Sequence, residues 1–278
     1  MSASIELSVV LPTFNEAGNI VSLIERVEAA LHGIPHEILV MDDRSPDGTA
    51  ALARAAAQAH PQALVIERDP PPGLTISIRD GIERAHGTFV AWMDCDFSHP
   101  PELLPELLAP LRDGTADITC ASRYVHGGAD ERGDSAAVFA SLAITKLAQW
   151  FIDRRVLDYT TGYVIAPRAL LLELGLRGDY GEYCIDLLGR ASLRGYRIRE
   201  VSYRSIPRVA GESKTATNLR GFVRRGWRYL VTIGRLFLTR RSVASAGVTP
   251  GTTTHDLEPA GAPEREVPPS AAGEGGGA

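Results

Sequence analysis

Thr88-Phe89-Val90-Ala91-Trp92-Met93-Asp94-Cys95-Asp96 is the stretch that decides the fold, because it joins an apolar run of strand length to two carboxylates. Similar runs recur along the first half of the chain, each separated from the next by a segment with apolar residues at helical spacing. The strand-like runs span 5–11, 37–41, 63–67, 88–93 and 117–121, and the helical patterns span 20–31, 50–59, 76–85 and 100–111. Strands that alternate with single helices predict an α/β fold: a Rossmann-like, mostly parallel sheet with helices on both faces.

Polar residues cluster after these predicted strands, at the sheet edge where open α/β sheets bind their ligands. Asp94 and Asp96 are the sharpest example, because two carboxylates one residue apart can turn toward one divalent cation, Mg²⁺ or Mn²⁺. A solvated turn is the alternative for such a pair taken alone. After the second strand, Asp42 or Asp43 can accept hydrogen bonds from a ribose or a base edge. The following Ser-Pro-Asp at 45–47 is typical of a helix start, with the proline as the first helical residue.

Composition narrows the class of protein. The chain has 278 residues, 44% hydrophobic and 23% charged, which suits one large α/β domain with appendages. Three cysteines without a C-x-x-C spacing predict reduced thiols and no cysteine metal site. The net charge of −5 argues against a nucleic-acid-binding protein. No basic residue precedes Arg26 and no uncharged apolar run reaches the roughly 18 residues of a membrane span, so we expect a cytoplasmic protein without signal peptide or transmembrane helix.

The second half of the chain has a looser pattern. A Gly- and Asp-rich stretch at 125–135 predicts a mobile loop, and residues 136–154 predict a helix. Strands are expected at 163–166 and 197–203, with a helix near 183–193 between them.

The C-terminal quarter separates into a basic and an acidic segment. Residues 213–241 carry eight bases and no acid, and 218–238 predict an amphipathic helix. Its apolar face consists of Leu219, Phe222, Leu230, Ile233 and Phe237, and its basic face of Arg224, Arg225, Arg228 and Arg235. We interpret the basic face as a contact with an anionic membrane surface; the alternative is a helix packed on the preceding domain with a solvated basic face. Residues 242–278 hold five acids, one base and few large apolar residues, which predicts a disordered acidic tail.

Six sequence blocks resemble, in their order, the family 2 glycosyltransferases of GT-A fold. Within that family they resemble the dolichol-phosphate or polyprenol-phosphate mannose synthases. The blocks are VLPTFNE (10–16), MDDRSPDGT (41–49), MDCDFSHPPE (93–102), SRYV (122–125), DYTTGY (158–163) and RVAGESK (208–214). The resemblance covers about residues 5–240. It divides the chain into a GT-A domain at 1–212, a basic closing or membrane-surface segment at 213–241 and the tail at 242–278.

The resemblance implies roles at the matching positions. The residues implied to bind the nucleotide sugar are Pro12, Phe14, Glu16, Met41, Asp43, Asp94, Cys95, Asp96, Arg123, Arg208 and Lys214. The cofactor, Mg²⁺ or Mn²⁺, would be held by Asp94, Asp96 and Ser98. The residues implied to be catalytic are Asp96, Asp158, Arg208 and Lys214. Arg208 and Lys214 would close over the phosphates, and Arg123 would face phosphate. Asp158 would orient the acceptor, with a turn cap before 160–162 as its alternative role.

The implied activity is inverting transfer of a hexose, mannose from GDP-mannose, to a polyprenyl or dolichyl phosphate at the cytoplasmic membrane face. An ionised lipid phosphate is already a nucleophile, so the reaction needs charge neutralisation at the diphosphate rather than a strong base. The implied partners are the donor, the lipid acceptor and the membrane surface, but no nucleic acid; a separate membrane-anchoring partner is compatible with them. The alternatives are a family 2 transferase with a UDP-sugar donor or a saccharide acceptor, and a nucleotide-sugar-binding protein without activity. Departures from the family pattern at 72–75 and 131–137 leave the acceptor open, and a further departure at 181–186 indicates a distinct subgroup.

Overall fold

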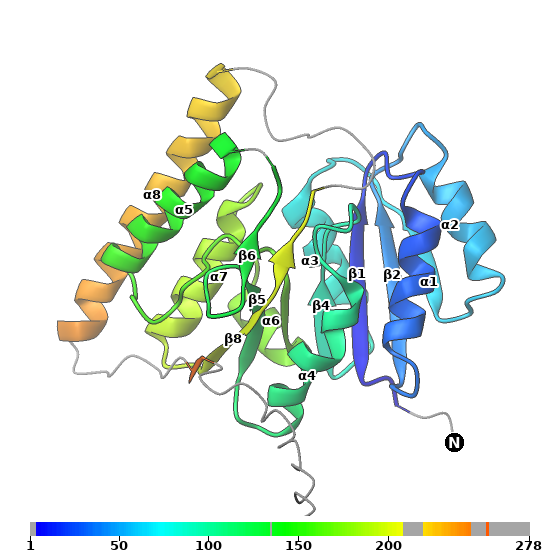
Figure 1. Ribbon diagram of the computed structural model, residues 1–278, viewed down its shortest axis with the longest axis horizontal. Helices are drawn as coiled ribbons and strands as arrows, with labels where there is room; N and C mark the ends of the chain where they lie inside the picture. The colour runs from blue at the N-terminus through cyan, green and yellow to red at the C-terminus, as the bar shows by residue number, and fades with distance from the viewer. Residues whose placement is uncertain (1–3, 134, 208–218, 246–253, 256–278) are drawn as a thin grey trace, which may run out of the picture.

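One central sheet organises the chain (Figure 1). The computed structural model describes residues 4–133, 135–207, 219–245 and 254–255. Within these residues the sheet has eight strands in the order β10-β8-β5-β7-β4-β1-β2-β3. Their bounds are β1 (Leu7–Thr13), β2 (His36–Asp42), β3 (Ala63–Glu67), β4 (Phe89–Trp92), β5 (Ile118–Ser122), β7 (Val164–Pro167), β8 (Ile198–Ser202) and β10 (Thr254–His255). Every strand predicted from the sequence is present, with ends that differ by two residues at most.

The direction of β7 sets this sheet apart from a purely parallel one. β7 runs antiparallel to both of its neighbours, β4 and β5. All the other neighbouring pairs are parallel. Because β7 is reversed, the segment before it, rather than the one after it, reaches the edge where the parallel strands end. The expected mostly parallel α/β sheet is therefore confirmed, with one reversed strand.

Helices cover both faces of the sheet, as the sequence predicts. The helices on one face are α1 (Ile20–Ala30), α2 (Thr49–Ala57) and α4 (Leu104–Arg112), which follows a short 3₁₀ turn at Pro101–Leu103. The helices on the other face are α3 (Leu74–Arg84), α6 (Arg168–Leu174) and α7 (Glu182–Leu193). β1 supplies both cores, because Val9 and Leu11 point into one cluster and Val10 into the other, all fully buried. Burial of apolar surface, at about 25 cal/mol per Å², stabilises both layers.

Two long helices lie side by side at one end of the molecule, α5 (Ser135–Phe151) and α8 (Leu219–Ser245) (Figure 1). The rings of Phe151 and Phe237 meet edge to face with centroids 5.4 Å apart. α8 also packs closely on α7, where a Cβ on Gly189 would lie 2.7 Å from the Leu236 Cδ1. α8 continues past the predicted end at 238, since residues 239–246 contain no glycine or proline that would end a helix. In the described part of the chain no helix is both long and apolar enough to cross a membrane.

Two of the arginines assigned to a basic membrane face are paired with carboxylates of the chain itself. Arg228 contacts Asp179 at 2.6 Å, just before α7, and Arg235 contacts the buried Asp186 of α7 at 2.5 Å. These pairs hold α8 against the domain, and the membrane contact of the basic face stays a prediction. The side chains at 224 and 225 lie outside the described residues.

The start of α2 differs from the prediction. The helix begins at Thr49 instead of Pro46. Gly48 adopts a left-handed φ of +87°, which separates the proline from the helix. The Asp47 carboxylate accepts hydrogen bonds from the Thr49 N–H at 3.0 Å and from its Oγ1 at 2.6 Å. Although burial raises the pKa of Asp47, these hydrogen bonds outweigh it and leave the pKa lowered. Asp47 is thus the side chain that accepts a hydrogen bond from the first backbone N–H group of α2.

Short strands appear in two segments predicted to lack them. The loop at 125–135 contains β6 (Ala129–Asp130), which pairs in parallel with β9 (Arg204–Ser205). This pairing fixes part of a loop that Gly and Asp content alone predicts to be mobile. Within the predicted tail, α8 extends to Ser245 and Thr254–His255 adds β10 to the open edge of β8. The rest of 242–278 lies outside the described residues.

Candidate active site

Hydrogen bonds from side chains join the ends of β1 and β2. Asp42 is fully buried and accepts hydrogen bonds from Thr13 Oγ1 at 3.1 Å and from the Ser45 N–H and Oγ at 2.8 and 2.6 Å. Ser45 Oγ in turn accepts the Asn15 N–H at 2.9 Å. These bonds give Asp42 and Ser45 a structural role, which leaves Asp43 as the carboxylate of this pair that can serve a ligand.

Asp43, predicted to contact the nucleotide, is held by a buried arginine that the sequence analysis misses. Arg68 follows β3 and forms ion pairs with Asp43 and with Asp80 of α3, the latter at 2.8 Å. Asp43 also accepts hydrogen bonds from the Gly73 N–H at 2.8 Å and from Ser77 Oγ at 3.1 Å. Burial lowers the pKa of Arg68, but its bonds to both aspartates outweigh burial and raise that pKa. A signal was available, since Arg68 directly follows a predicted strand.

The other predicted nucleotide contacts differ in accessibility. Phe14 is 42% exposed just beyond β1, and Glu16 is half-buried beside it. Met41 is fully buried in the core, so its side chain packs the sheet and offers no surface to a ligand. Cys95 is also buried, and its Sγ lies 3.5 Å from the Pro12 carbonyl oxygen. The thiol therefore ties the loop after β4 to the end of β1.

The loop after β4 carries the two carboxylates of the predicted metal site. Asp96 is buried and its Oδ1 accepts the Ser98 N–H at 3.0 Å, while Asp94 is half-buried. Phe97 has a φ of +64°, which turns the loop back on itself. Two carboxylates are the hard oxygen donors that Mg²⁺ takes together with substrate phosphates and water, so the donor set fits such an ion. No group of three or more His, Cys, Asp or Glu among the described side chains could hold a metal, so these two would share it with substrate oxygens.

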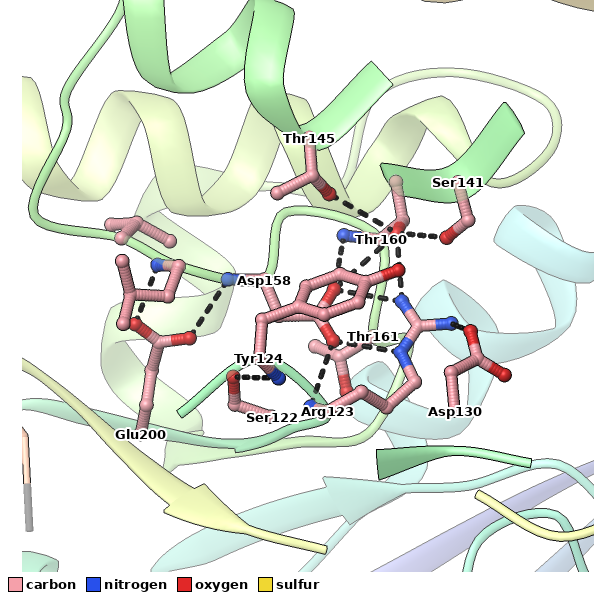
Figure 2. Close-up of polar contacts among 12 residues, drawn as sticks. Ser122, Arg123, Tyr124, Asp130, Ser141, Thr145, Asp158, Thr160, Thr161 and Glu200 are labelled. Atoms are coloured by element: carbon pink, nitrogen blue, oxygen red, sulfur yellow. Dashed lines mark hydrogen bonds and ion pairs between the residues drawn. The ribbon is translucent and has the colours of Figure 1, made fainter. Parts of the chain in front are cut away.

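A buried ion pair lies at the end of β5 (Figure 2). Nε and Nη2 of Arg123 donate to the two carboxylate oxygens of Asp158, both at 2.8 Å, and the Arg123 N–H donates to Oδ2 at 3.1 Å. Nη1 contacts Asp130 at 3.2 Å, and Nη2 also donates to Thr160 Oγ1 at 2.8 Å. Burial lowers the pKa of Arg123, but the charge and hydrogen bonds of Asp158 outweigh it and hold that pKa above its ordinary value. Arg123 therefore stays charged and engaged.

This geometry bears on two predicted roles. Asp158 has no exposed surface and Arg123 is 4% exposed, so neither side chain faces a ligand directly in this structure. Asp158 does cap the following turn, because its Oδ1 accepts the Thr160 N–H at 3.0 Å. Thr160 Oγ1 lies 2.7 Å from Ser141 Oγ of α5. The pair thus fixes the position of the loop 158–162 relative to β5 and α5.

Glu200 on β8 supports the same loop and is a second residue that the sequence analysis misses. Its two carboxylate oxygens accept the N–H groups of Leu157 and Asp158 at 2.7 and 2.8 Å (Figure 2). Burial raises the pKa of Glu200 to about 7, although these hydrogen bonds act in the opposite direction. The signal for it was an acid in the middle of the predicted strand 197–203. Arg208 and Lys214, by contrast, lie outside the described residues, and their roles stay predictions.

The sequence that carries these strand ends matches the model of one known family. The family model "Glycosyl transferase family 2" matches residues 8–173, more than half of the chain and every strand end from β1 to β7. The chain belongs to glycosyl transferase family 2.

Curated relatives of this glycosyltransferase align over most of it. Dolichol-phosphate mannosyltransferase of Pyrococcus furiosus is 39% identical, with 70% of this chain and 61% of the relative covered. Polyprenol monophosphomannose synthase of Mycolicibacterium smegmatis is 35% identical, with 76% and 82% covered. Undecaprenyl-phosphate mannosyltransferase of Micrococcus luteus is 33% identical, with 76% and 88% covered. The chain thus spans about three fifths of the length of the first of these relatives.

Solved structures with the same architecture include a sugar-nucleotide enzyme. Glucosyl-3-phosphoglycerate synthase from Mycobacterium tuberculosis, solved with Mn²⁺, UDP and phosphoglyceric acid, has a TM-score of 0.65 at 22% identity, covering 84% of this chain and 79% of that one. The same enzyme solved with Mg²⁺ and UDP has a TM-score of 0.63 at 21% identity, covering 86% and 80%. These likenesses confirm a GT-A-like fold for this family 2 glycosyltransferase.

Proposed function

We propose that this chain transfers mannose from GDP-mannose to a polyprenyl phosphate, with inversion at the anomeric carbon. The observation that carries the proposal is that three relatives at 33–39% identity are named for mannosyl transfer to dolichol, polyprenol or undecaprenyl phosphates. The geometry supports it, because the ends of β1, β2 and β4, which carry the predicted donor contacts, lie on neighbouring strands at one sheet edge.

In this proposal Asp94 and Asp96 hold Mg²⁺ or Mn²⁺, which when bound neutralises charge on the leaving diphosphate. Oδ1 of Asp43 is occupied by Arg68 and Ser77, while Oδ2 accepts the Gly73 N–H and keeps one lone pair for a hydrogen bond from the nucleoside. The ionised acceptor phosphate attacks the sugar directly, so the chain supplies orientation and positive charge instead of a general base. The Arg123–Asp158 pair contributes by holding the loop 158–162 in place beside that site.

Donor and metal are tested together. Purified protein is incubated with a short polyprenyl phosphate, Mn²⁺ or Mg²⁺, and radiolabelled GDP-mannose, UDP-glucose or UDP-galactose, and label is counted in the lipid extract. Label from GDP-mannose alone, lost by two orders of magnitude or more in Asp94→Asn and Asp96→Asn, is the expected result. Asp113→Asn changes an exposed acid at the end of α4 and serves as the matched control. Lipid labelling from a UDP-sugar, or undiminished activity of both loop variants, would refute the donor or the metal assignment respectively.

We also propose that α8 contacts the membrane surface through an exposed apolar stripe, which places the protein peripherally on the cytoplasmic face. Trp227, Val231 and Leu238 are 65%, 50% and 65% exposed and recur at helical spacing. The neighbouring α5 exposes Trp150 to a similar degree, with Arg154 stacked 5.2 Å over its ring. Exposed apolar patches mark interaction surfaces, and tryptophan favours the membrane–water interface. The contact would bring the site to a lipid-borne phosphate.

Vesicle co-sedimentation tests this surface against the basic-face interpretation. Phosphatidylcholine vesicles with and without phosphatidylglycerol are used at two ionic strengths. The double change Trp227→Ser and Val231→Ser is expected to lower vesicle binding at least fivefold at both ionic strengths, because it removes apolar contacts. Arg228→Gln is the control, since Arg228 is already paired with Asp179. The apolar stripe is contradicted if salt abolishes vesicle binding and the serine variant still binds as the wild type does. If the wild type binds no vesicles at all, the membrane contact of α8 is wrong and a separate anchoring partner is indicated.

A further inference from the structure

His99 lies behind the metal-site loop with both ring nitrogens engaged. It is 4% exposed. Nδ1 lies 3.1 Å from the backbone nitrogen of Asp94, and Nε2 lies 3.0 Å from the carbonyl oxygen of Thr161. One imidazole therefore joins two loops that are 62 residues apart in the sequence. The first carries the carboxylates of the proposed metal site, and the second contains Asp158, the partner of Arg123.

The two backbone partners fix the protonation state of this ring. A backbone N–H can only donate, so Nδ1 of His99 must be the acceptor toward Asp94. A carbonyl can only accept, so Nε2 must carry the proton that is donated to Thr161. Only the neutral Nε2–H tautomer satisfies both bonds, because an imidazolium would point a second N–H at the Asp94 N–H.

Packing prevents the ring from leaving this position. Tyr163 stacks on His99 with centroids 5.0 Å apart and planes 24° apart, and Tyr203 meets it edge-on at 5.9 Å. The Tyr163 hydroxyl donates to the Pro100 carbonyl at 3.1 Å, a further bond between the same two chain segments. At Gly162 an added Cβ would lie 3.6 Å from the imidazole Cε1, so the loop backbone runs directly over the ring. The imidazole therefore holds the two loops at a fixed separation.

We propose that His99 is a positioning residue that couples metal and donor binding at Asp94 to the placement of the acceptor-side loop 158–162. The inference rests on the proposed function, namely that Asp94 is a metal ligand, that a polyprenyl phosphate is the acceptor and that the loop 158–162 lies on the acceptor's side of the site. The hydrogen bond that the Asp94 N–H donates to Nδ1 sets where the Asp94 backbone, and hence its carboxylate, lies. The bond from Nε2 sets where Thr161, and hence the loop held by Asp158 and Arg123, lies relative to it.

Two amide substitutions separate the two bonds. In His99→Asn, the side-chain oxygen takes the place of Nδ1 and keeps the bond to Asp94, but the side chain is too short to reach Thr161. In His99→Gln, the side-chain nitrogen takes the place of Nε2 and keeps the bond to Thr161, but the acceptor for Asp94 is displaced. Mn²⁺ affinity is measured by electron paramagnetic resonance with excess GDP present. KM for a short polyprenyl phosphate is measured at saturating donor, and thermal unfolding monitors folding.

Opposite effects of the two variants are expected. His99→Gln should weaken Mn²⁺ binding about tenfold and change the acceptor KM little, since loss of one buried hydrogen bond is worth about a factor of ten. His99→Asn should raise the acceptor KM by a similar factor and leave Mn²⁺ affinity nearly unchanged. Equal losses in both variants, as a merely structural histidine would give, overturn the coupling. Asp94→Asn separates the two proposals: if it leaves Mn²⁺ affinity unchanged, the metal site itself is wrong and the coupling falls with it.

Discussion

Glu200→Gln is expected to remove a large part of the pH dependence of stability. The carboxyl of Glu200 is fully buried, and its pKa is raised from 4.5 to about 7 in the folded protein. Between these two pH values the native state binds more protons at this site than the unfolded chain does. The contribution of Glu200 to stability is therefore fully present below pH 4.5 and is lost as the pH rises through 7.

The magnitude follows from the size of the shift. A raised pKa of about 7 against 4.5 corresponds to roughly 3 to 4 kcal/mol at about 1.4 kcal/mol per pKa unit, of which roughly 2 to 3 kcal/mol falls between pH 5 and 8. Gln cannot titrate, so the stability of Glu200→Gln lacks this decrease with rising pH. Gln also offers only one acceptor oxygen to the N–H groups of Leu157 and Asp158, and that cost is the same at every pH.

Urea unfolding at pH 5 and pH 8 isolates the effect. The free energy of unfolding is measured for wild type and Glu200→Gln at both pH values, and the difference between the proteins is compared. The titrations of all other groups cancel in this comparison. The wild type should lose roughly 2 to 3 kcal/mol relative to the variant as the pH rises from 5 to 8. A difference between the two proteins that is the same at both pH values would show that burial does not raise the pKa of Glu200.

Two further predictions use matched pairs within the chain. Asp158→Asn should destabilise the protein by about 3 kcal/mol, because it leaves the Arg123 charge buried without its main partner. Asp117→Asn breaks the same bidentate geometry at the more exposed Arg197, and it should cost far less in the same urea titration. Gly128→Ala should lower both stability and the proposed mannosyl transfer, because its Cβ would lie 2.6 Å from the Ser122 carbonyl oxygen and push the backbone at Arg123. Gly226→Ala, with nothing within 4 Å, should leave transfer unchanged and stabilise α8 by up to about 1 kcal/mol. Equal losses within either pair contradict the burial or the steric argument.

The described part of the fold could be predicted closely from local patterns, since strands and helices follow from the period of the apolar residues. The runs at 37–41 and 88–93 became β2 and β4 because apolar strands between two helical layers are buried on both faces. The D-x-D pair was visible because two carboxylates one residue apart directly follow the apolar run 88–93. Helix starts were less predictable, as at Thr49, because a left-handed Gly48 overrides the proline signal.

What the sequence determined by itself is therefore the seven longer strands of the central sheet, the loop of Asp94 and Asp96 and the family. Only the tertiary structure decided the partners of the buried charges. β7 runs antiparallel, and no local pattern encodes strand direction, since the same apolar run suits either pairing. This reversal brings Asp158 to the edge where β5 presents Arg123, 35 residues earlier in the chain. Buried charges require a partner, and which carboxylate meets which guanidinium depends on long-range packing that residue spacing does not record.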